Sequence, residues 1–220
     1  DLGIAWDGDF DRCFFFDENG NFVDNYYLIG LLSERLLANH PNSSIVHDPR
    51  LVWNTQEEVK KNLGVPILSK AGHSFIKEVM RENNAIYGGE MSGHHYFRDF
   101  YYSDSGMIPW LLLLQSISES GKTLLELVSE RVSKFPISGE INTTVANPQQ
   151  LLEIVKNHYQ QYDPFIHDID GYSFDFKTWR FNLRMSNTEP LVRLNVESIE
   201  DQALMEDKTK EILALIDQYK

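Results

Sequence analysis

The chain has 220 residues, enough for one large domain or two smaller ones with hydrophobic cores of their own. Its net charge of −13 argues against nucleic acid or an anionic membrane as a partner. Cys13 is the only cysteine, so the chain has no internal disulfide, and we expect a reducing, cytoplasmic location. The longest apolar stretch, residues 107–114, is too short to span a bilayer.

Strands and helices alternate through the first 134 residues. We expect strands at residues 3–6, 14–16, 21–23, 44–47, 65–68 and 85–87. We expect helices at residues 26–39, 55–63, 74–83, 105–118 and 123–134. Thr55 with Glu58, and Thr123 with Glu126, have capping-box spacing, which predicts that two of these helices begin at the threonines. The alternation predicts an α/β domain with a mixed sheet and helices on its faces.

The pattern changes near residues 134–138, where we place a linker. A strand at 139–144 and a helix at 148–159 follow, with Pro148 in the first turn of the helix. Three strands are then expected near 171–176, 180–184 and 191–197, and a last helix near 199–219. This order predicts a smaller α+β domain with an antiparallel sheet.

An acidic loop follows the first predicted strand. Asp7, Asp9 and Asp11 alternate along the chain, and Arg12 comes next. If the backbone curls as it leaves the strand, the three carboxylates can reach one point. Such hard oxygen ligands suit Mg²⁺. A solvated turn rich in Asp and Gly is the alternative.

Two further polar loops each follow a predicted strand. In residues 88–95, Glu90, Ser92 and His94 alternate, and they offer hydrogen-bonding groups suited to sugar hydroxyls. In residues 184–190, Arg184 can bind a phosphate through two hydrogen bonds, and it precedes three polar side chains, Ser186, Asn187 and Thr188. Arg193 is out of phase with its apolar neighbours and could face the same site. A glycine-rich surface loop and a polar hairpin are the respective alternatives.

Two smaller signals are consistent with an anionic ligand. Gly72 and His73 stand at the start of a predicted helix, whose N-terminus attracts anions. Arg50 follows a strand end, where ligand residues gather in α/β sheets. Either feature alone is more often a helix cap or a surface charge.

In this order and spacing, the three loops resemble those of the α-D-phosphohexomutase family, above all its bacterial phosphomannomutase branch. The resemblance implies a Mg²⁺ loop formed by Asp7, Asp9 and Asp11, with Arg12 facing the substrate. It implies a sugar-binding loop and a phosphate-binding loop, formed by Glu90, Ser92 and His94 and by Arg184, Ser186, Asn187 and Thr188. It also implies roles for Gly72, His73 and Arg50, although many members have lysine in place of Arg50 and glycine in place of Phe10.

The resemblance also implies a domain division and a reaction. Residues 1–24 would be the remnant of a second domain, residues 25–135 a sugar-binding third domain, and residues 136–220 a phosphate-binding fourth domain. The expected reaction interconverts mannose 6-phosphate and mannose 1-phosphate through a phosphoserine and a bisphosphate, and feeds GDP-mannose synthesis. His73 or His94 would carry the hydroxyl proton. The family's phosphoserine loop, Thr-x-Ser-His-Asn-Pro, does not occur in this sequence, so we expect it in an N-terminal domain acting in cis, without which this chain is inactive.

Three alternatives remain open from the sequence. A phosphoglucomutase or a dual-specificity phosphohexomutase would use the same motifs. An aspartate-nucleophile phosphatase or mutase would use Asp7, but the third aspartate and Arg12 fit that pattern poorly. A non-enzymatic Ca²⁺-binding module would use Asp7, Asp9, Asp11 and Glu18, but Arg12 stands where such a loop requires glycine.

Overall fold

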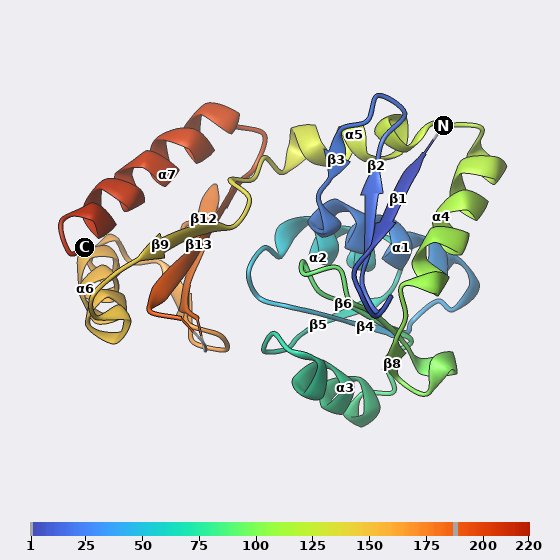
Figure 1. The fold of residues 1–220 in the computed structure, drawn as a ribbon, viewed down its shortest axis with the longest axis horizontal. Coiled ribbons are helices and arrows are strands. Elements are labelled where there is room, and N and C mark those ends of the chain that lie inside the picture. Colours follow the sequence, from blue (N-terminus) through green and yellow to red (C-terminus); the bar gives the residue numbers. More distant parts are fainter. Residues whose placement is uncertain (1, 187–188) are drawn as a thin grey trace. The chain divides into compact units, whose positions relative to one another are not determined.

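The computed structural model describes residues 2–186 and 189–220, which divide into two compact units. The first comprises residues 1–48 and 52–131, and the second comprises residues 49–51 and 132–220. Figure 1 shows the chain order of their elements. None of the described helices has the length and apolar composition needed to cross a membrane.

The first unit contains two sheets. Its strands are β1 (Gly3–Trp6), β2 (Cys13–Phe16), β3 (Phe22–Val23), β4 (Ser44–His47), β5 (Val65–Leu68), β6 (Tyr87–Gly89), β7 (His95–Phe97) and β8 (Ser103–Asp104). Its helices are α1 (Asn25–Asn39), α2 (Trp53–Lys61), α3 (His73–Glu82), α4 (Met107–Ser120) and α5 (Leu124–Lys134), the last of which continues into the second unit, with a short 3₁₀ helix at Arg98–Phe100.

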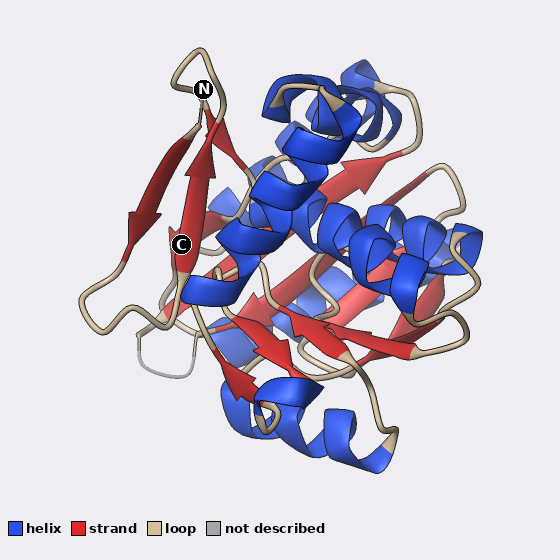
Figure 2. Cartoon of the chain, turned by 90° about the vertical axis from the view of Figure 1, so that its right-hand side faces the viewer, coloured by secondary structure: helices blue, strands red, loops and turns tan. Residues whose placement is uncertain are grey.

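The larger sheet of this unit is mixed, as the alternation of strands and helices predicts. Its order is β5-β4-β6-β7-β8, with parallel pairing of β4 to β5 and β6 and antiparallel pairing beyond β6. Neighbouring residues of β4 face opposite sides, so Ile45 packs in a core with α1 and α2, whereas Val46 packs with α3. Figure 2 shows helices on both sides of these strands.

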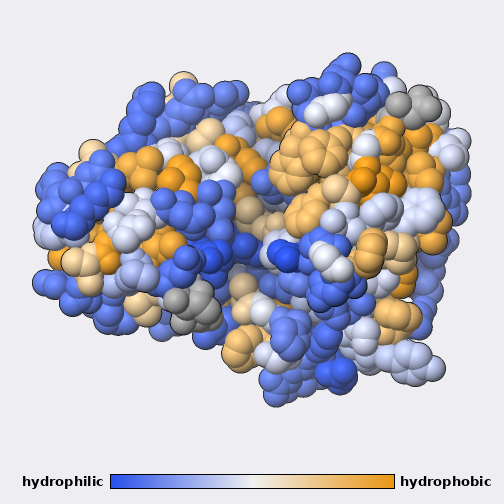
Figure 3. Space-filling model, viewed as in Figure 1, coloured by the Kyte–Doolittle hydropathy of each residue, from blue (hydrophilic) through white to orange (hydrophobic). Residues whose placement is uncertain are grey.

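The smaller sheet, β1-β2-β3, is antiparallel and precedes α1. Its outer face is aromatic: the Phe22 ring lies 5.8 Å from that of Phe16 and 6.5 Å from that of Phe14. Apolar side chains gather over these strands in Figure 3, and Phe22 is exposed. The assignment of residues 1–24 to a preceding domain stays a prediction.

The second unit is an antiparallel sheet packed against two helices. Its elements are β9 (Ile141–Thr144), α6 (Pro148–Tyr159), a 3₁₀ helix (Gln160–Tyr162), β10 (Phe165–His167), β11 (Tyr172–Asp175), β12 (Trp179–Met185), β13 (Leu191–Ser198) and α7 (Gln202–Asp217). The strand order is β10-β11-β12-β13-β9, and every pair is antiparallel. The predicted α+β class is therefore confirmed.

Alternation along β12 and β13 gives this sheet two different faces. Phe181, Leu183 and Val192 belong to the core with α6 and α7. The intervening residues form cross-strand pairs on the other face, among them Arg180 with Glu197 and Arg184 with Arg193. The fold therefore places two arginines opposite each other.

The structure corrects several sequence expectations. α2 begins at Trp53, and Thr55 is buried inside the helix, so the first capping box is wrong. The second is confirmed, because Thr123 N–H donates to Glu126 and Glu126 N–H to the Thr123 hydroxyl. The sequence analysis missed three short strands, β7, β8 and β10.

Candidate functional site

The acidic loop joins β1 to β2 and curls on itself. Asp7, Asp9 and Asp11 each offer a carboxylate oxygen within 4.8 Å of the others. Phe10 has φ 62°, and its N–H lies 3.4 Å from the Asp7 carbonyl oxygen. This tight turn brings the three alternating carboxylates together.

Arg12 is bound to the first aspartate of the loop. Its Nε lies 2.6 Å from Asp7 Oδ2, and its backbone N–H donates to Asp7 Oδ1 at 3.2 Å. Partial burial acts to raise the pKa of Asp7, but the hydrogen bonds and charge of Arg12 outweigh it and lower that pKa. Asp7 is therefore held as a carboxylate.

Asp11 carries the unfavourable electrostatics of the loop. Burial, with a further contribution from Asp7 and Asp9, raises the pKa of Asp11, although His94 opposes this shift. Its buried Oδ1 has no hydrogen-bond partner among the residues that the structure describes. Crowded carboxylates with an unsatisfied oxygen fit a hard divalent cation well.

The glycine-rich loop between β6 and β7 lies against this acidic loop. Arg12 and His94 form an isolated antiparallel bridge, and Cys13 N–H donates to the Gly93 carbonyl at 3.1 Å. Gly93 has φ 93°, a conformation that favours glycine. Backbone pairing therefore joins two segments that lie about eighty residues apart in sequence.

This pairing places His94 between two of the predicted site residues. Its Nδ1 lies 2.8 Å from Ser92 Oγ, and its Nε2 lies 3.5 Å from Asp11 Oδ2. Asp104, from β8, also reaches Asp11 and His94 within 4.8 Å. Sequence reasoning missed Asp104 because only the pairing of β7 with β8 brings it to this place.

Glu90 is buried beside the start of α3. Gly72 N–H donates to Glu90 Oε2 at 2.8 Å, and the Tyr96 hydroxyl donates to Oε1 at 2.5 Å. Both carboxylate oxygens therefore already accept a hydrogen bond within the first unit. His73, the first residue of α3, is exposed and forms no hydrogen bond or ion pair with the acidic loop among the described residues.

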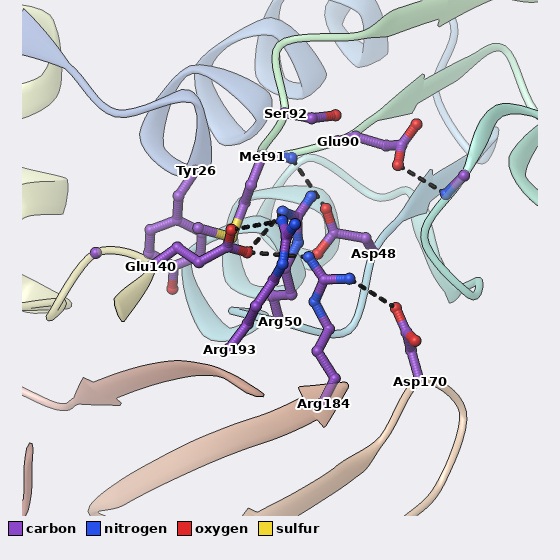
Figure 4. A network of polar contacts seen from close by, with 12 residues as sticks. Tyr26, Asp48, Arg50, Glu90, Met91, Ser92, Glu140, Asp170, Arg184 and Arg193 are labelled. Carbon is purple, nitrogen blue, oxygen red and sulfur yellow. Dashed lines mark hydrogen bonds and ion pairs between the residues drawn. The ribbon is translucent and has the colours of Figure 1, made fainter. Parts of the chain in front are cut away.

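The predicted phosphate-binding arginines lie in the second unit, where Figure 4 shows them around Glu140. Glu140 Oε2 lies 3.0 Å from Arg184 and 3.2 Å from Arg50, and Oε1 lies 3.0 Å from Arg193. The structure thus groups three of the predicted arginines. Ser186 lies just beyond β12, and the predicted ligands Asn187 and Thr188 lie outside the described residues.

Arg180 secures the segment that carries Arg50. It is buried, pairs with Glu197 at 2.7 Å, and donates to the carbonyl oxygens of Pro49 and Arg50 at 3.1 and 3.0 Å. This anchor explains why residues 49–51 belong to the second unit although their neighbours belong to the first.

Gly106 supports the acidic loop from outside, and its replacement by alanine should disturb the loop. A Cβ there would lie 2.6 Å from the Phe10 carbonyl oxygen and 2.9 Å from that of Arg12. We expect Gly106→Ala to lower the free energy of unfolding by about 1–3 kcal/mol, as measured by urea denaturation.

Gly8→Ala is the matched control, because a Cβ at Gly8 meets no atom within 4 Å. We expect this substitution to change the stability by less than about 0.5 kcal/mol. Equal effects of the two substitutions would show that the loop does not depend on its close contact with Gly106.

Two family models match the chain. "Phosphoglucomutase/phosphomannomutase, alpha/beta/alpha domain III" matches residues 24–135, and "Phosphoglucomutase/phosphomannomutase, C-terminal domain" matches residues 140–215. The chain therefore belongs to the phosphoglucomutase/phosphomannomutase family, the α-D-phosphohexomutases, as its motifs predict.

Similar proteins include curated bacterial relatives and a solved structure. A relative described as "Phosphohexose mutases" from Xanthomonas campestris is 57% identical over 98% of this chain and 48% of its own length. A phosphomannomutase from Escherichia coli K12 is 55% identical over 99% of this chain and 48% of its own length. A family protein from Burkholderia thailandensis superposes with a TM-score of 0.83, at 26% identity, over 100% of this chain and 48% of that one. The chain thus spans about half the length of the curated relatives it matches.

Proposed function

We propose that the whole protein is a phosphomannomutase that interconverts mannose 6-phosphate and mannose 1-phosphate through a phosphoserine and a bisphosphate intermediate, and supplies GDP-mannose synthesis. The observation that carries this proposal is the Arg12–His94 bridge, which joins the acidic loop to the predicted sugar-binding loop. The names of the curated relatives from Salmonella typhimurium and Escherichia coli support mannose. The relative from Xanthomonas campestris is named for phosphohexoses in general. Its name supports a dual-specificity phosphohexomutase or a phosphoglucomutase as the second candidate function.

Asp7, Asp9 and Asp11 would hold Mg²⁺, since their oxygens lie close together and Asp11 Oδ1 lacks a hydrogen-bond partner among the described residues. When bound, the ion supplies positive charge that offsets the negative charge on the transferred phosphoryl group. The alternative Ca²⁺ module has no support here, because strands β1 and β2 flank the loop and Glu18 accepts a hydrogen bond from Leu125 N–H.

The side chains around this loop have separate tasks in the proposal. Arg12 would stabilise negative charge on the phosphoryl oxygens of the substrate. Ser92 fixes the His94 ring through Nδ1, which leaves Nε2 on the side of Asp11 to take the hydroxyl proton. His73 remains the other candidate for that proton. Glu90 would use remaining lone pairs to accept from sugar hydroxyls.

The second unit would hold the phosphate that is not being transferred. Arg50, Arg184 and Arg193 supply the positive charge, and Ser186, Asn187 and Thr188 supply further donors. The arginines would hold that phosphate in either of the two orientations of the phosphohexose.

Activity requires a part of the protein that this sequence does not contain. Because the phosphoserine motif does not occur in these 220 residues, we propose that the chain binds the sugar phosphate but does not turn it over alone. The longer protein, with its N-terminal domains restored in cis, should convert mannose 1-phosphate to mannose 6-phosphate in a coupled assay, and glucose 1-phosphate more slowly. Turnover by the 220 residues alone, or none by the longer protein with either sugar, would contradict the proposal.

A further inference from the structure

Glu140 is an acidic residue inside a cluster whose predicted ligand is an anion. It precedes β9, and β9 pairs with β13 through Asn142 and Arg193. Its side chain extends to three guanidinium groups, those of Arg50, Arg184 and Arg193 (Figure 4). Burial acts to raise the pKa of Glu140, but the three arginines outweigh it, so the pKa is lowered and the group is an anion at neutral pH.

The sheet itself creates the need for this anion. Arg184 and Arg193 are direct cross-strand partners on one face, and like charges in that position repel each other. Arg50 adds a third positive charge. Glu140 bridges all three, whereas Asp170 lies 4.0 Å from Arg184.

The cluster has hydrogen-bonding capacity that Glu140 does not use. Glu140 takes a single terminal nitrogen from each guanidinium group. The buried Nε atoms of Arg184 and Arg193 have no hydrogen-bond partner within the described parts of the chain. A phosphate has more oxygens than a carboxylate and can bind guanidinium groups in bidentate fashion, so it satisfies these donors better.

We propose that Glu140 is a resident counter-ion that occupies the phosphate-binding arginines in the unliganded protein and that the substrate phosphate displaces. This inference rests on the proposed function, in which the same arginines bind the sugar phosphate. Glu140 keeps three like charges assembled between turnovers. It also weakens phosphate binding, because the phosphate must take over nitrogens that the carboxylate holds.

The test is a calorimetric titration of inorganic phosphate into the 220-residue chain. Glu140→Gln keeps the shape of the side chain and removes its charge, so we expect phosphate to bind about tenfold more tightly than to the original chain. Glu140→Asp keeps the charge on a shorter arm and should give an intermediate affinity. The melting temperature of Glu140→Gln should be lower without phosphate, and added phosphate should raise it more than it raises that of the original chain.

Each outcome has a definite meaning. Unchanged or weaker phosphate binding by both Glu140 variants would overturn the counter-ion role. A lower melting temperature in Glu140→Gln with the same response to phosphate as the original chain would likewise reduce Glu140 to a structural residue. Arg184→Ala separates this failure from that of the proposed function. If the original chain binds phosphate and Arg184→Ala does not, the proposed phosphate site is supported, whatever the result for the Glu140 variants. If both bind phosphate equally, the proposed phosphate site and the counter-ion role of Glu140 are both contradicted.

Discussion

Arg180→Met is expected to lower the free energy of unfolding of the second unit by about 3–5 kcal/mol, because it removes the guanidinium group that pairs with the buried Glu197 carboxylate. Arg180 and Glu197 are both buried and lie 2.7 Å apart. The substitution also removes the hydrogen bonds that Arg180 donates to the carbonyl oxygens of Pro49 and Arg50. Urea denaturation followed by tryptophan fluorescence measures the change, since Trp179 adjoins Arg180 in β12.

Two further variants show whether the pair itself is responsible. Arg98→Met removes an ion pair with Asp99, whose side chain is 77% exposed, and should change stability by less than about 1 kcal/mol. Arg180→Met with Glu197→Leu removes both buried charges and should recover part of the loss. A loss below about 1 kcal/mol in Arg180→Met alone would contradict the anchoring role of this arginine.

Asp11→Asn is expected to weaken Mg²⁺ binding by on the order of a hundredfold. Mutation of residues that only support a metal ligand already lowers metal affinity by about tenfold to a hundredfold, and Asp11 is a proposed direct ligand. Asp11 is the residue shared by the two groups of acidic and histidine side chains that converge here. Mg²⁺ affinity is measured by calorimetry on the 220-residue chain.

Stability separates loss of a ligand from loss of the fold. Without Mg²⁺, Asp11→Asn should be no less stable than the original chain, since the amide removes repulsion between crowded carboxylates. Asp99→Asn, at an exposed position, is the control and should bind Mg²⁺ unchanged. Equal Mg²⁺ affinity in Asp11→Asn and Asp99→Asn would exclude the acidic loop as the metal site.

Most of the fold could be predicted from local patterns. The alternation in β12 and β13 fixed both their strand character and their apolar face, because side chains in a strand alternate between faces. The strand β7 was missed because its three residues, His95–Phe97, are too few to show a period. The misplaced start of α2 has another cause: the Thr55–Glu58 pair has the spacing of a cap, but tertiary packing buries the threonine inside the helix.

Some residues of the candidate site could likewise be predicted from the sequence, and others could not. Asp7, Asp9 and Asp11 could be found from the sequence because they alternate within one loop, and their convergence depends only on a local turn. Glu140 could not be found from the sequence, because a single glutamate before a strand belongs to no recognisable pattern. Its place among the arginines follows from the pairing of β9 with β13, which joins residues about fifty positions apart.

Calorimetric titration of mannose 6-phosphate into the 220-residue chain with Mg²⁺ tests most directly whether this chain binds a phosphorylated sugar. We expect saturable binding, none for unphosphorylated mannose, and a loss of about tenfold to a hundredfold in Arg184→Ala, since hydrogen bonds to charged groups contribute about 1.5–3 kcal/mol. Arg98→Ala, at a surface ion pair, should bind as the original chain does. Equal affinity for mannose and mannose 6-phosphate, or an unchanged affinity in Arg184→Ala, would contradict the account.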